Sequence, residues 1–277
     1  MNEGPGYRED RGSEAGRTID TDSAFLRVES ISKTYPARDK QPVEAIKDIS
    51  FSLSKGEFAS ILGPSGCGKS TLLLIIAGLI APTSGQMIFR EPDSTSETDF
   101  GIVFQDPVLF PWRDVQANVE LPGEIARLDR EERSAKARQL IALVGLQGFE
   151  RKYPYELSGG MQQRVSIARA LMLSPSLLLM DEPFGALDAM TREQMNLELQ
   201  KISLATGATV VFVTHSITEA AFLSDRVMVM TGRPATLKDV VTIDTPRPRG
   251  IDMIASGHFS DHVARLRRLL NARSDPT

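Results

Sequence analysis

The stretch GPSGCGKST at residues 63–71 limits what this chain can fold into more than any other part of its sequence. It fits the pattern G-x-x-x-x-G-K-[ST], it follows the short apolar stretch GEFASIL, and it opens a run that reads as a buried helix from Lys69 to Gly78. Glycines between a strand and a helix let backbone N–H groups turn inward around phosphate oxygens, and the helix N-terminus adds partial positive charge. The stretch therefore predicts a phosphate-binding loop, and with it a nucleotide site in an α/β fold.

Two side chains of this loop have predicted tasks. Lys69 would reach the β- and γ-phosphates, and the Ser70 hydroxyl would be a Mg²⁺ ligand. Cys67 could be a redox-sensitive thiol activated by the helix N-terminus, but a small residue that simply fills a loop position is the favoured interpretation. The residues of the loop that we expect to line the nucleotide are Gly63, Pro64, Ser65, Gly66, Cys67, Gly68, Lys69, Ser70 and Thr71.

Strand patterns of two kinds surround the loop. Residues 25–53 alternate between apolar and polar side chains, which is typical of half-buried antiparallel strands. The stretches SLLLMDEP, ATVVFVTHS and RVMVM are apolar and rich in branched side chains, and helical stretches at 162–173, 191–206 and 217–223 accompany them. Strands that alternate with helices indicate a parallel sheet covered on both faces. We therefore expect an α/β fold: a P-loop nucleotide-hydrolase core with a mixed or parallel sheet, and an antiparallel β subdomain.

The sequence also predicts a division into regions. Residues 1–23 are polar, charged and glycine-rich, which predicts a disordered tail and not a secretory signal. Residues 24–250 would form the nucleotide-hydrolysing domain, with a helical insert subdomain at about 106–160, where β patterns are almost absent. Residues 251–277 would form an amphipathic C-terminal helix that covers the sheet. The apolar stripe of that helix consists of Phe259, Val263, Leu266 and Leu270.

Composition excludes several classes of protein. The net charge of −4 provides no basic field of the kind that binds nucleic acid. A single cysteine excludes an intramolecular disulfide and favours a reducing compartment. The longest apolar run, at 72–81, is about half of the roughly 20 residues that a membrane span needs. The sequence predicts a soluble protein, or one held at a membrane only by a partner.

Two neighbouring acids follow the apolar strand LLLM. Asp181 ends that strand, at the edge where open α/β sheets bind their ligands, and would hold Mg²⁺. Glu182 comes next and could orient and deprotonate an attacking water. A solvated loop acid is the ordinary alternative for Glu182, but its neighbour and its place at a strand end favour catalysis.

Three further polar or aromatic residues are weaker candidates when each is taken alone. His215 closes the strand TVVFVT at the same expected edge, where an imidazole could hydrogen-bond a γ-phosphate oxygen, although a lone histidine after a strand is usually structural. Gln105 also ends a strand, and a side-chain amide can ligate Mg²⁺ and accept from water. Tyr35 could stack on adenine or could simply pack in its strand.

A second glycine-rich helix start lies at LSGGMQQR, residues 157–164. Ser158, Gly159 and Gly160 precede a good helical pattern, so their backbone N–H groups again form an anion site. Without a lysine or a metal ligand this site cannot bind a nucleotide well alone. It could complete a site that a second copy of the chain begins, or Ser158 could be an ordinary helix cap. The residues by themselves leave both interpretations open.

The order of these motifs resembles that of ATP-binding subunits of ABC transporters. GPSGCGKST, Gln105, LSGGMQQR, LLLMDEP, ALD at 186–188 and His215 follow one another as in that family, over about residues 25–245. The resemblance implies an ATPase that uses ATP and Mg²⁺ and that closes head to tail as a homodimer on two ATP molecules. It implies that Ser158–Gly160 face the γ-phosphate held by the partner's Lys69, that Tyr35 stacks on adenine, and that Asp188 communicates across the dimer.

A narrower resemblance concerns the kind of transporter. GIVFQDPVLFPWRDVQANVELP, DEPFGALDAMTRE and THSITEAAFLSDRVMVM resemble the branch that powers bacterial import of nitrate, alkanesulfonates and taurine. That branch implies separate permease subunits and an extracytoplasmic substrate-binding protein, with the ATPase at the cytoplasmic face of the cell membrane. We expect the apolar stretch Val108–Trp112 to contact the permease, although Phe110 and Trp112 could instead be core.

Other functions in the same family are the alternatives. One is an importer of another small nutrient, and another is a soluble ABC ATPase that acts outside transport. Sustained heptads and a second cassette, which soluble members carry, are absent from the sequence. Lys69, Asp181, Glu182 and His215 are all present, which argues against a scaffold without catalysis. No residue of an ATPase subunit needs to touch the imported anion, so the sequence does not name the substrate.

Overall fold

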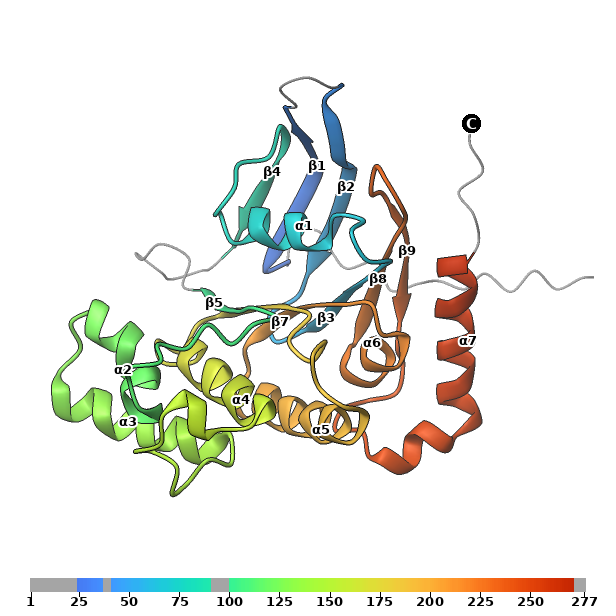
Figure 1. Ribbon diagram of the computed structural model, residues 1–277. Coiled ribbons are helices and arrows are strands. Elements are labelled where there is room, and N and C mark those ends of the chain that lie inside the picture. Colours follow the sequence, from blue (N-terminus) through green and yellow to red (C-terminus); the bar gives the residue numbers. More distant parts are fainter. Residues whose placement is uncertain (1–23, 37–40, 91–99, 272–277) are drawn as a thin grey trace, which may run out of the picture.

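A computed structural model describes residues 24–36, 41–90 and 100–271 of the chain (Figure 1). The tail expected at 1–23 lies outside the described residues, as do the last six residues of the range 251–277. Among the described residues, no helix is both long enough and apolar enough to cross a membrane.

A six-stranded sheet forms the centre of the molecule, in the order β5-β6-β7-β3-β8-β9. All neighbouring pairs are parallel except β8 and β9, which are antiparallel. The mixed sheet expected from the sequence is therefore confirmed. Its strands are β3 (Phe58–Leu62), β5 (Phe100–Val103), β6 (Leu177–Asp181), β7 (Thr209–Thr214), β8 (Arg226–Met230) and β9 (Leu237–Thr242).

Both faces of this sheet are buried, which explains why its central strands are apolar throughout. Side chains of β7 alternate between two hydrophobic clusters: Val210 and Phe212 face one, whereas Val211 and Val213 face the other. The first cluster includes residues of two helices described below and of α4 (Gly159–Ala170), α5 (Ala189–Thr206), α6 (Ile217–Leu223) and α7 (Gly257–Asn271). The second includes the apolar side of α1 (Lys69–Ile76).

A smaller antiparallel sheet lies on the α1 side, in the order β2-β1-β4 (Figure 1). Its strands are β1 (Leu26–Tyr35), β2 (Val43–Leu53) and β4 (Ser84–Phe89). The buried residues Leu26, Ile31 and Ile49 alternate with more exposed ones, as the pattern at 25–53 predicted. This sheet and α1 share one hydrophobic cluster, and α1 is thereby held between two sheets.

The described residues between β5 and α4 form helices and loops but no strand. They include α2 (Val115–Ile125), α3 (Arg130–Leu143) and a 3-10 turn at Pro154–Glu156. Asp114 and Asp129 cap the two helices by accepting backbone N–H bonds. In Figure 1 these helices stand at the opposite side of the molecule from α7. The boundaries of the predicted insert and of the other regions remain predictions.

Two helices begin earlier than the sequence predicts, because a capping residue precedes the apolar pattern of each. α4 begins at Gly159 and not near residue 162 because Ser158 caps it, and α5 begins at Ala189 because Asp188 caps it. At the C-terminal end, a 3-10 helix at Ile251–Ala255 precedes α7, so the long helix starts at Gly257. The α7 side chains Phe259 and Leu266 are buried beside β8, β9 and α6.

Candidate nucleotide-binding and catalytic site

One edge of the central sheet gathers the predicted site residues. β5, β6, β7 and β3 run parallel and are neighbours, so their carboxyl ends lie side by side. In register, Val103 pairs with Met180, Asp181 with Val213, and Thr214 with Leu62. The residues that follow these strands are Gln105, Glu182, His215 and the loop at 63–71. The expectation that His215 and Asp181 end at the same edge is confirmed.

The phosphate loop is shaped by glycines and closed by Lys69. Gly66 and Gly68 have φ angles of 73° and 117°, which side-chain-bearing residues adopt only with strain. Lys69 is 3% exposed and is the first residue of α1. Its Nζ donates to the carbonyl oxygens of Gly63 at 3.0 Å and Pro64 at 3.1 Å. A buried cation thus lies directly under the loop that would receive phosphates.

Ser70 and Asp181 form the second pair of the site. The Ser70 hydroxyl donates to Asp181 Oδ1 at 3.0 Å, across 111 residues of chain. Burial raises the pKa of Asp181, and the Ser70 hydrogen bond only partly offsets this. A hydroxyl and a carboxylate oxygen side by side are hard oxygen ligands, and a divalent cation would relieve the cost of the buried charge. The donor chemistry therefore fits Mg²⁺.

Glu182 contacts both Lys69 and His215, one through each oxygen of its carboxylate. Its Oε1 lies 3.2 Å from Lys69 Nζ, and its Oε2 lies 2.8 Å from His215 Nδ1. Burial alone would raise the pKa of Glu182, but the hydrogen bond with His215 and the charge of Lys69 hold that pKa below its ordinary value. Glu182 also has a φ of 43°, an uncommon conformation for a residue with a side chain. An ionised carboxylate at a strand end, held by a backbone of uncommon conformation, can accept a proton from a water molecule.

Tyr35 lines a pocket beside the loop. The pocket has a volume of about 210 Å³, and Tyr35 is 38% exposed. Its lining residues are Tyr35, Val43, Ala45, Thr71 and Arg233, together with the loop residues Gly66, Cys67 and Gly68. Lys33 Nζ lies 5.3 Å from the Tyr35 ring centre. An exposed aromatic ring over a pocket next to a phosphate loop fits a base-stacking position.

Arg233 also lies at this site, although its residue type and position do not predict it from the sequence. It lies in the turn between β8 and β9, and its Nε donates to the carbonyl oxygen of Gly66 at 2.7 Å. Its Nη2 lies 3.0 Å from where a side chain at Gly66 would begin. No sequence pattern marks this contact, because 167 residues separate the partners and only the pairing of β3 with β8 brings them together.

Two predicted site residues lie outside the network of polar contacts that Lys69, Glu182 and His215 form. Gln105 is exposed, and its Nε2 lies near the backbone of Gly185, in the loop after Glu182. Cys67 is 3% exposed, and burial raises the pKa of its thiol. A protonated, buried thiol supports the interpretation that Cys67 fills a loop position.

The second glycine-rich turn lies apart from the first. The Ser158 hydroxyl accepts from the N–H of Met161 at 3.3 Å and so caps α4. A methyl group added at Gly160 would lie 2.9 Å from Thr191 Cγ2, and Thr191 donates its hydroxyl to Asp188 at 2.6 Å. Among the described residues, no hydrogen bond or ion pair joins Ser158–Gly160 to residues 63–71. The chain brings Asp188 to the second turn but not to its own phosphate loop.

Comparison with known proteins identifies the family. The family model described as "ABC transporter" matches residues 46–185. An uncharacterized ABC transporter ATP-binding protein of Methanocaldococcus jannaschii is 48% identical over 81% of this chain and 84% of its own length. A taurine import ATP-binding protein of Roseobacter denitrificans is 43% identical, over 76% of this chain and 80% of that protein. A nitrate import ATP-binding protein of Synechococcus elongatus is also 43% identical, over 84% of this chain and 85% of that protein.

A solved structure agrees with this family. The ATP-binding cassette MJ0796, solved as a dimer in a post-hydrolysis state bound to ADP and Pi, superposes with a TM-score of 0.68. The two chains are 34% identical. The alignment covers 80% of this chain and 100% of the solved one. Fold, motif order and relatives agree, and the chain is therefore an ATPase that belongs to the ABC transporter family.

Proposed function

We propose that this chain is the ATP-hydrolysing subunit of an importer for a small anion such as nitrate, taurine or an alkanesulfonate. The observation that carries the ATPase part is the continuous polar chain from Lys69 through Glu182 to His215, beside the Ser70–Asp181 pair. The nitrate and taurine import proteins among the relatives support the anion part. Nitrate and the sulfonate group of taurine are both small and negatively charged, so the proposal names that class.

The geometry suggests how Glu182 becomes available as a base. Both of its oxygens are engaged, one by Lys69 and the other by His215. The γ-phosphate of ATP would compete for Lys69 Nζ, and Glu182 Oε1 would then be free to accept a proton from the attacking water. His215 would keep hold of the other oxygen and so fix the carboxylate. As an imidazolium it would also donate its second N–H to the γ-phosphate.

Ser70 and Asp181 would hold Mg²⁺, with Gln105 as a further candidate ligand. The ion would neutralise charge on the β- and γ-phosphates when bound. Gln105 would have to turn from its position near Gly185 toward the metal. Tyr35 would stack on the adenine ring, while the backbone of residues 63–71 would surround the phosphates.

A head-to-tail homodimer would complete the site. The turn at Ser158–Gly160 has open space at Gly159, where an added methyl group would meet only Leu187, at 3.8 Å. Such a turn in one copy could cap the γ-phosphate held by Lys69 of the other, and two-fold symmetry would give two such sites. Asp188, which caps α5 next to this turn, would then lie at the interface between copies.

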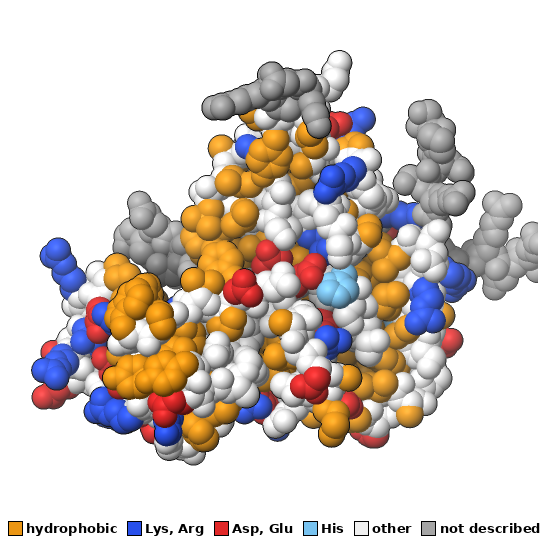
Figure 2. Space-filling model, viewed as in Figure 1, with side chains coloured by type: hydrophobic (Ala, Val, Ile, Leu, Met, Phe, Trp, Pro, Cys, Tyr) orange, Lys and Arg blue, Asp and Glu red, His pale blue; other side chains and the backbone are white. Residues whose placement is uncertain are grey.

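We further propose that the stretch Val108–Trp112 contacts a permease subunit. Val108 is 61% exposed and Trp112 is 71% exposed, so neither is core. Phe110 and Trp112 contact each other edge to face at 5.2 Å. Figure 2 shows hydrophobic side chains gathered on the surface of the region that contains α2 and α3. This arrangement would place the ATPase at the cytoplasmic face of the membrane, with an extracytoplasmic binding protein in the same system.

The test is transport by cells in which Glu182→Gln replaces the native chain. Uptake of labelled taurine, an alkanesulfonate and nitrate is measured, together with ATP hydrolysis by the purified chain. We expect ATP hydrolysis to fall by about 10²- to 10⁴-fold and uptake of one anion to be lost. Glu132→Gln is the matched control, because Glu132 is an exposed acid on α3 and its loss should change neither measurement.

The two readouts separate the two parts of the proposal. Normal ATP hydrolysis by Glu182→Gln would contradict the role of Glu182. Lost hydrolysis with unchanged uptake of all three anions would leave the ATPase in place but refute the anion class, and the alternatives in the family would follow.

A further inference from the structure

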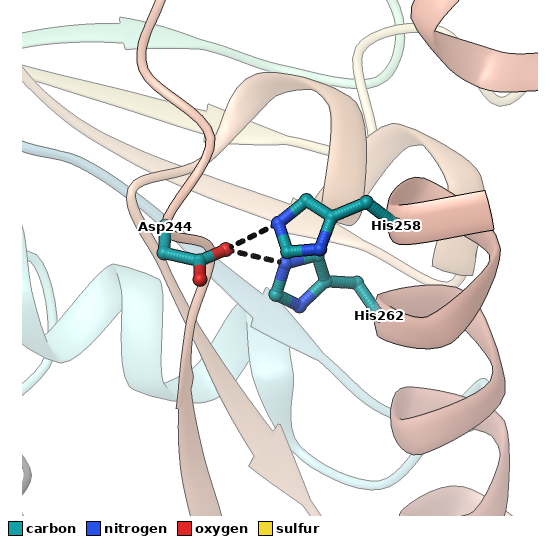
Figure 3. A group of neighbouring side chains, drawn as sticks. All are labelled: Asp244, His258 and His262. Carbon is teal, nitrogen blue, oxygen red and sulfur yellow. Dashed lines mark hydrogen bonds and ion pairs between the residues drawn. The ribbon is translucent and has the colours of Figure 1, made fainter. Parts of the chain in front are cut away.

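Two of the three histidines in the chain meet one aspartate far from the phosphate loop. His258 and His262 lie on α7, and Asp244 lies in the segment just after β9 (Figure 3). Nε2 of His258 and Nε2 of His262 each lie 2.8 Å from the same oxygen, Asp244 Oδ1. The two imidazole rings are 4.8 Å apart at their centres. The nucleotide site uses none of these three residues.

The spacing of the two histidines is suited to shared coordination. Residues four apart on a helix lie on the same face one turn above the other, so both rings can point at one position. Figure 3 shows both rings directed from α7 toward the Asp244 carboxylate. One ligand atom from each residue, two nitrogens and one oxygen, lie within 4.8 Å of one another. Two imidazoles and a carboxylate form one of the protein ligand sets that catalytic zinc sites use.

The distances are close to those that a metal requires. Zinc bonds of about 2.0–2.2 Å in a tetrahedral site separate neighbouring ligand atoms by about 3.3 Å. The observed 2.8 Å separations are hydrogen-bond distances, so each nitrogen would need to move by about 0.5 Å from the carboxylate oxygen. The two nitrogens, which lie within 4.8 Å of each other, would also need to reach a separation of about 3.3 Å. His258 and Asp244 are exposed and can make this shift, whereas the His262 side chain is 13% exposed and provides the fixed ligand. The His258 side chain is 57% exposed and that of Asp244 is 66% exposed, which leaves a fourth position open to water.

We propose that Asp244, His258 and His262 form a binding site for one divalent transition-metal ion of the zinc type. The ion takes the place of the two Nε2 protons, so that each imidazole binds as the neutral ring protonated on Nδ1, and the displaced proton passes to Nδ1 or to water. It joins α7 to the segment that follows β9, because Asp244 and the histidines come from different elements. The C-terminal helix is then held to the molecule by metal bonds in addition to the buried Phe259 and Leu266. This site is independent of the proposed transport function.

The experiment is a calorimetric titration of Zn²⁺ into the full-length chain. Mg²⁺ is present in excess, and no other transition metal is added. The chain provides its own matched control, because it has three histidines and each can be replaced singly. We expect one Zn²⁺ per chain for the native protein and for His215→Ala. We expect at least about a tenfold weaker affinity for His258→Ala and for His262→Ala. Asp244→Asn should be weakened in the same way.

A second measurement distinguishes the loss of a metal ligand from the misfolding of a variant. His258 is exposed, so His258→Ala should fold and should hydrolyse ATP at the native rate. Zn²⁺ should raise the melting temperature of the native chain, since a ligand that binds only the folded state stabilises it, and should not raise that of His258→Ala. Equal Zn²⁺ affinity in the native chain, His258→Ala and His262→Ala would overturn the proposal. Loss of binding in His215→Ala alone would also overturn it, as would the absence of binding to the native chain.

Discussion

Two helices of this protein, α1 and α4, begin at glycine-rich turns, yet the two turns have very different surroundings. At the start of α1, Lys69 is buried and lies 3.2 Å from Glu182, and Ser70 bonds Asp181. At the start of α4, Ser158 caps the helix and Gly159 has almost nothing in front of it. The first turn lies at the carboxyl edge of the central sheet, where neighbouring strands add charged groups. The second lies outside that edge and receives no cation from a neighbouring strand, and the charged residue beside it, Asp188, is an acid that caps α5.

Magnitudes show why this difference matters. A helix N-terminus stabilises a nearby anion by about 0.3–1 kcal/mol at the surface. Even a dissociation constant of about 1 mM needs about 4 kcal/mol. The turn at Ser158 therefore cannot hold a nucleotide alone, whereas a buried lysine with further charged groups can. A turn of this kind is useful to the protein only when another site has already bound the phosphate, which is the physical argument for a composite site between two copies.

We call the turn at residues 63–71 the complete turn, because charged groups surround it, and the turn at Ser158–Gly160 the incomplete turn. The largest effect should come from removing Lys69, the cation of the complete turn. Lys69→Ala leaves the carbonyls of Gly63 and Pro64 and the carboxylate of Glu182 without their cation. We expect ATP hydrolysis to fall by at least about 100-fold, the usual loss when a group that stabilises developing charge is removed. Lys201→Ala, on the exposed side of α5, is the control and should keep the native rate. A Lys69→Ala chain with more than half of that rate would contradict the assignment.

The next prediction tests whether the incomplete turn acts on the partner's nucleotide. Ser158→Arg places a bulky side chain at this turn, and the purified variant should bind ATP through its own loop but should not hydrolyse it. Mixing it with Lys69→Ala chains produces mixed dimers in which one composite site is intact. If half of the dimers are mixed and half of their sites work, the mixture should regain roughly a quarter of the native rate. A mixture that stays inactive would indicate that the turn serves its own chain.

A smaller effect should appear in the stability of the complete site. Burial raises the pKa of Asp181, so the folded state binds this proton more readily than the unfolded chain does. The ionised carboxylate therefore costs stability above its folded pKa, and the cost disappears as the pH falls below the unfolded value. We expect Asp181→Asn to raise the melting temperature at pH 7 by roughly 2–4 °C, with a difference that shrinks toward pH 4.

Mg²⁺ provides the control for this stability measurement. The ion should raise the melting temperature of the native chain at neutral pH and should do so less for Asp181→Asn, because binding to the folded state alone is stabilising. An equal Mg²⁺ effect on both chains would show that the ion binds elsewhere. No comparable effect of substitution is expected at Ser158, where no buried charge is present.

The two turns also show how far sequence reasoning reached. The parallel strands could be predicted from apolar runs, and the edge that such strands share could be predicted to hold Asp181 and His215 together. The hydrogen bonds that Glu182 and Lys69 form could not be predicted from the sequence, because they depend on side-chain positions and on the unusual φ of Glu182. The predicted helix starts were wrong by two or three residues because Ser158 and Asp188 satisfy N–H groups outside the apolar pattern.

Contacts between distant parts of the chain account for the rest of what sequence reasoning missed. Arg233 reaches Gly66 only because β8 lies next to β3, and the meeting of Asp244 with His258 and His262 depends on where α7 packs. No local pattern marks the approach of Arg233 to Gly66 or of Asp244 to the two histidines, although the histidines themselves have helical spacing. In contrast, the exposed character of Trp112 could be anticipated as one of two options, since an apolar side chain in a turn is either core or interface.

The smallest predicted effect concerns the support that Arg233 gives to the complete turn, for which the turn at Ser158 has no equivalent. A single hydrogen bond from Arg233 Nε to the Gly66 carbonyl contributes about 0.5–1.5 kcal/mol, so Arg233→Ala should weaken ATP binding by about two- to tenfold. Arg138→Ala, on α3, is the control and should bind ATP normally. Arg233→Lys then separates two causes. If lysine restores the affinity, the charge beside the phosphates is what matters. If lysine behaves as alanine does, the planar guanidinium acts by holding the Gly66 carbonyl, and the complete turn depends on a side chain from the turn after β8, the strand next to β3, to keep its shape.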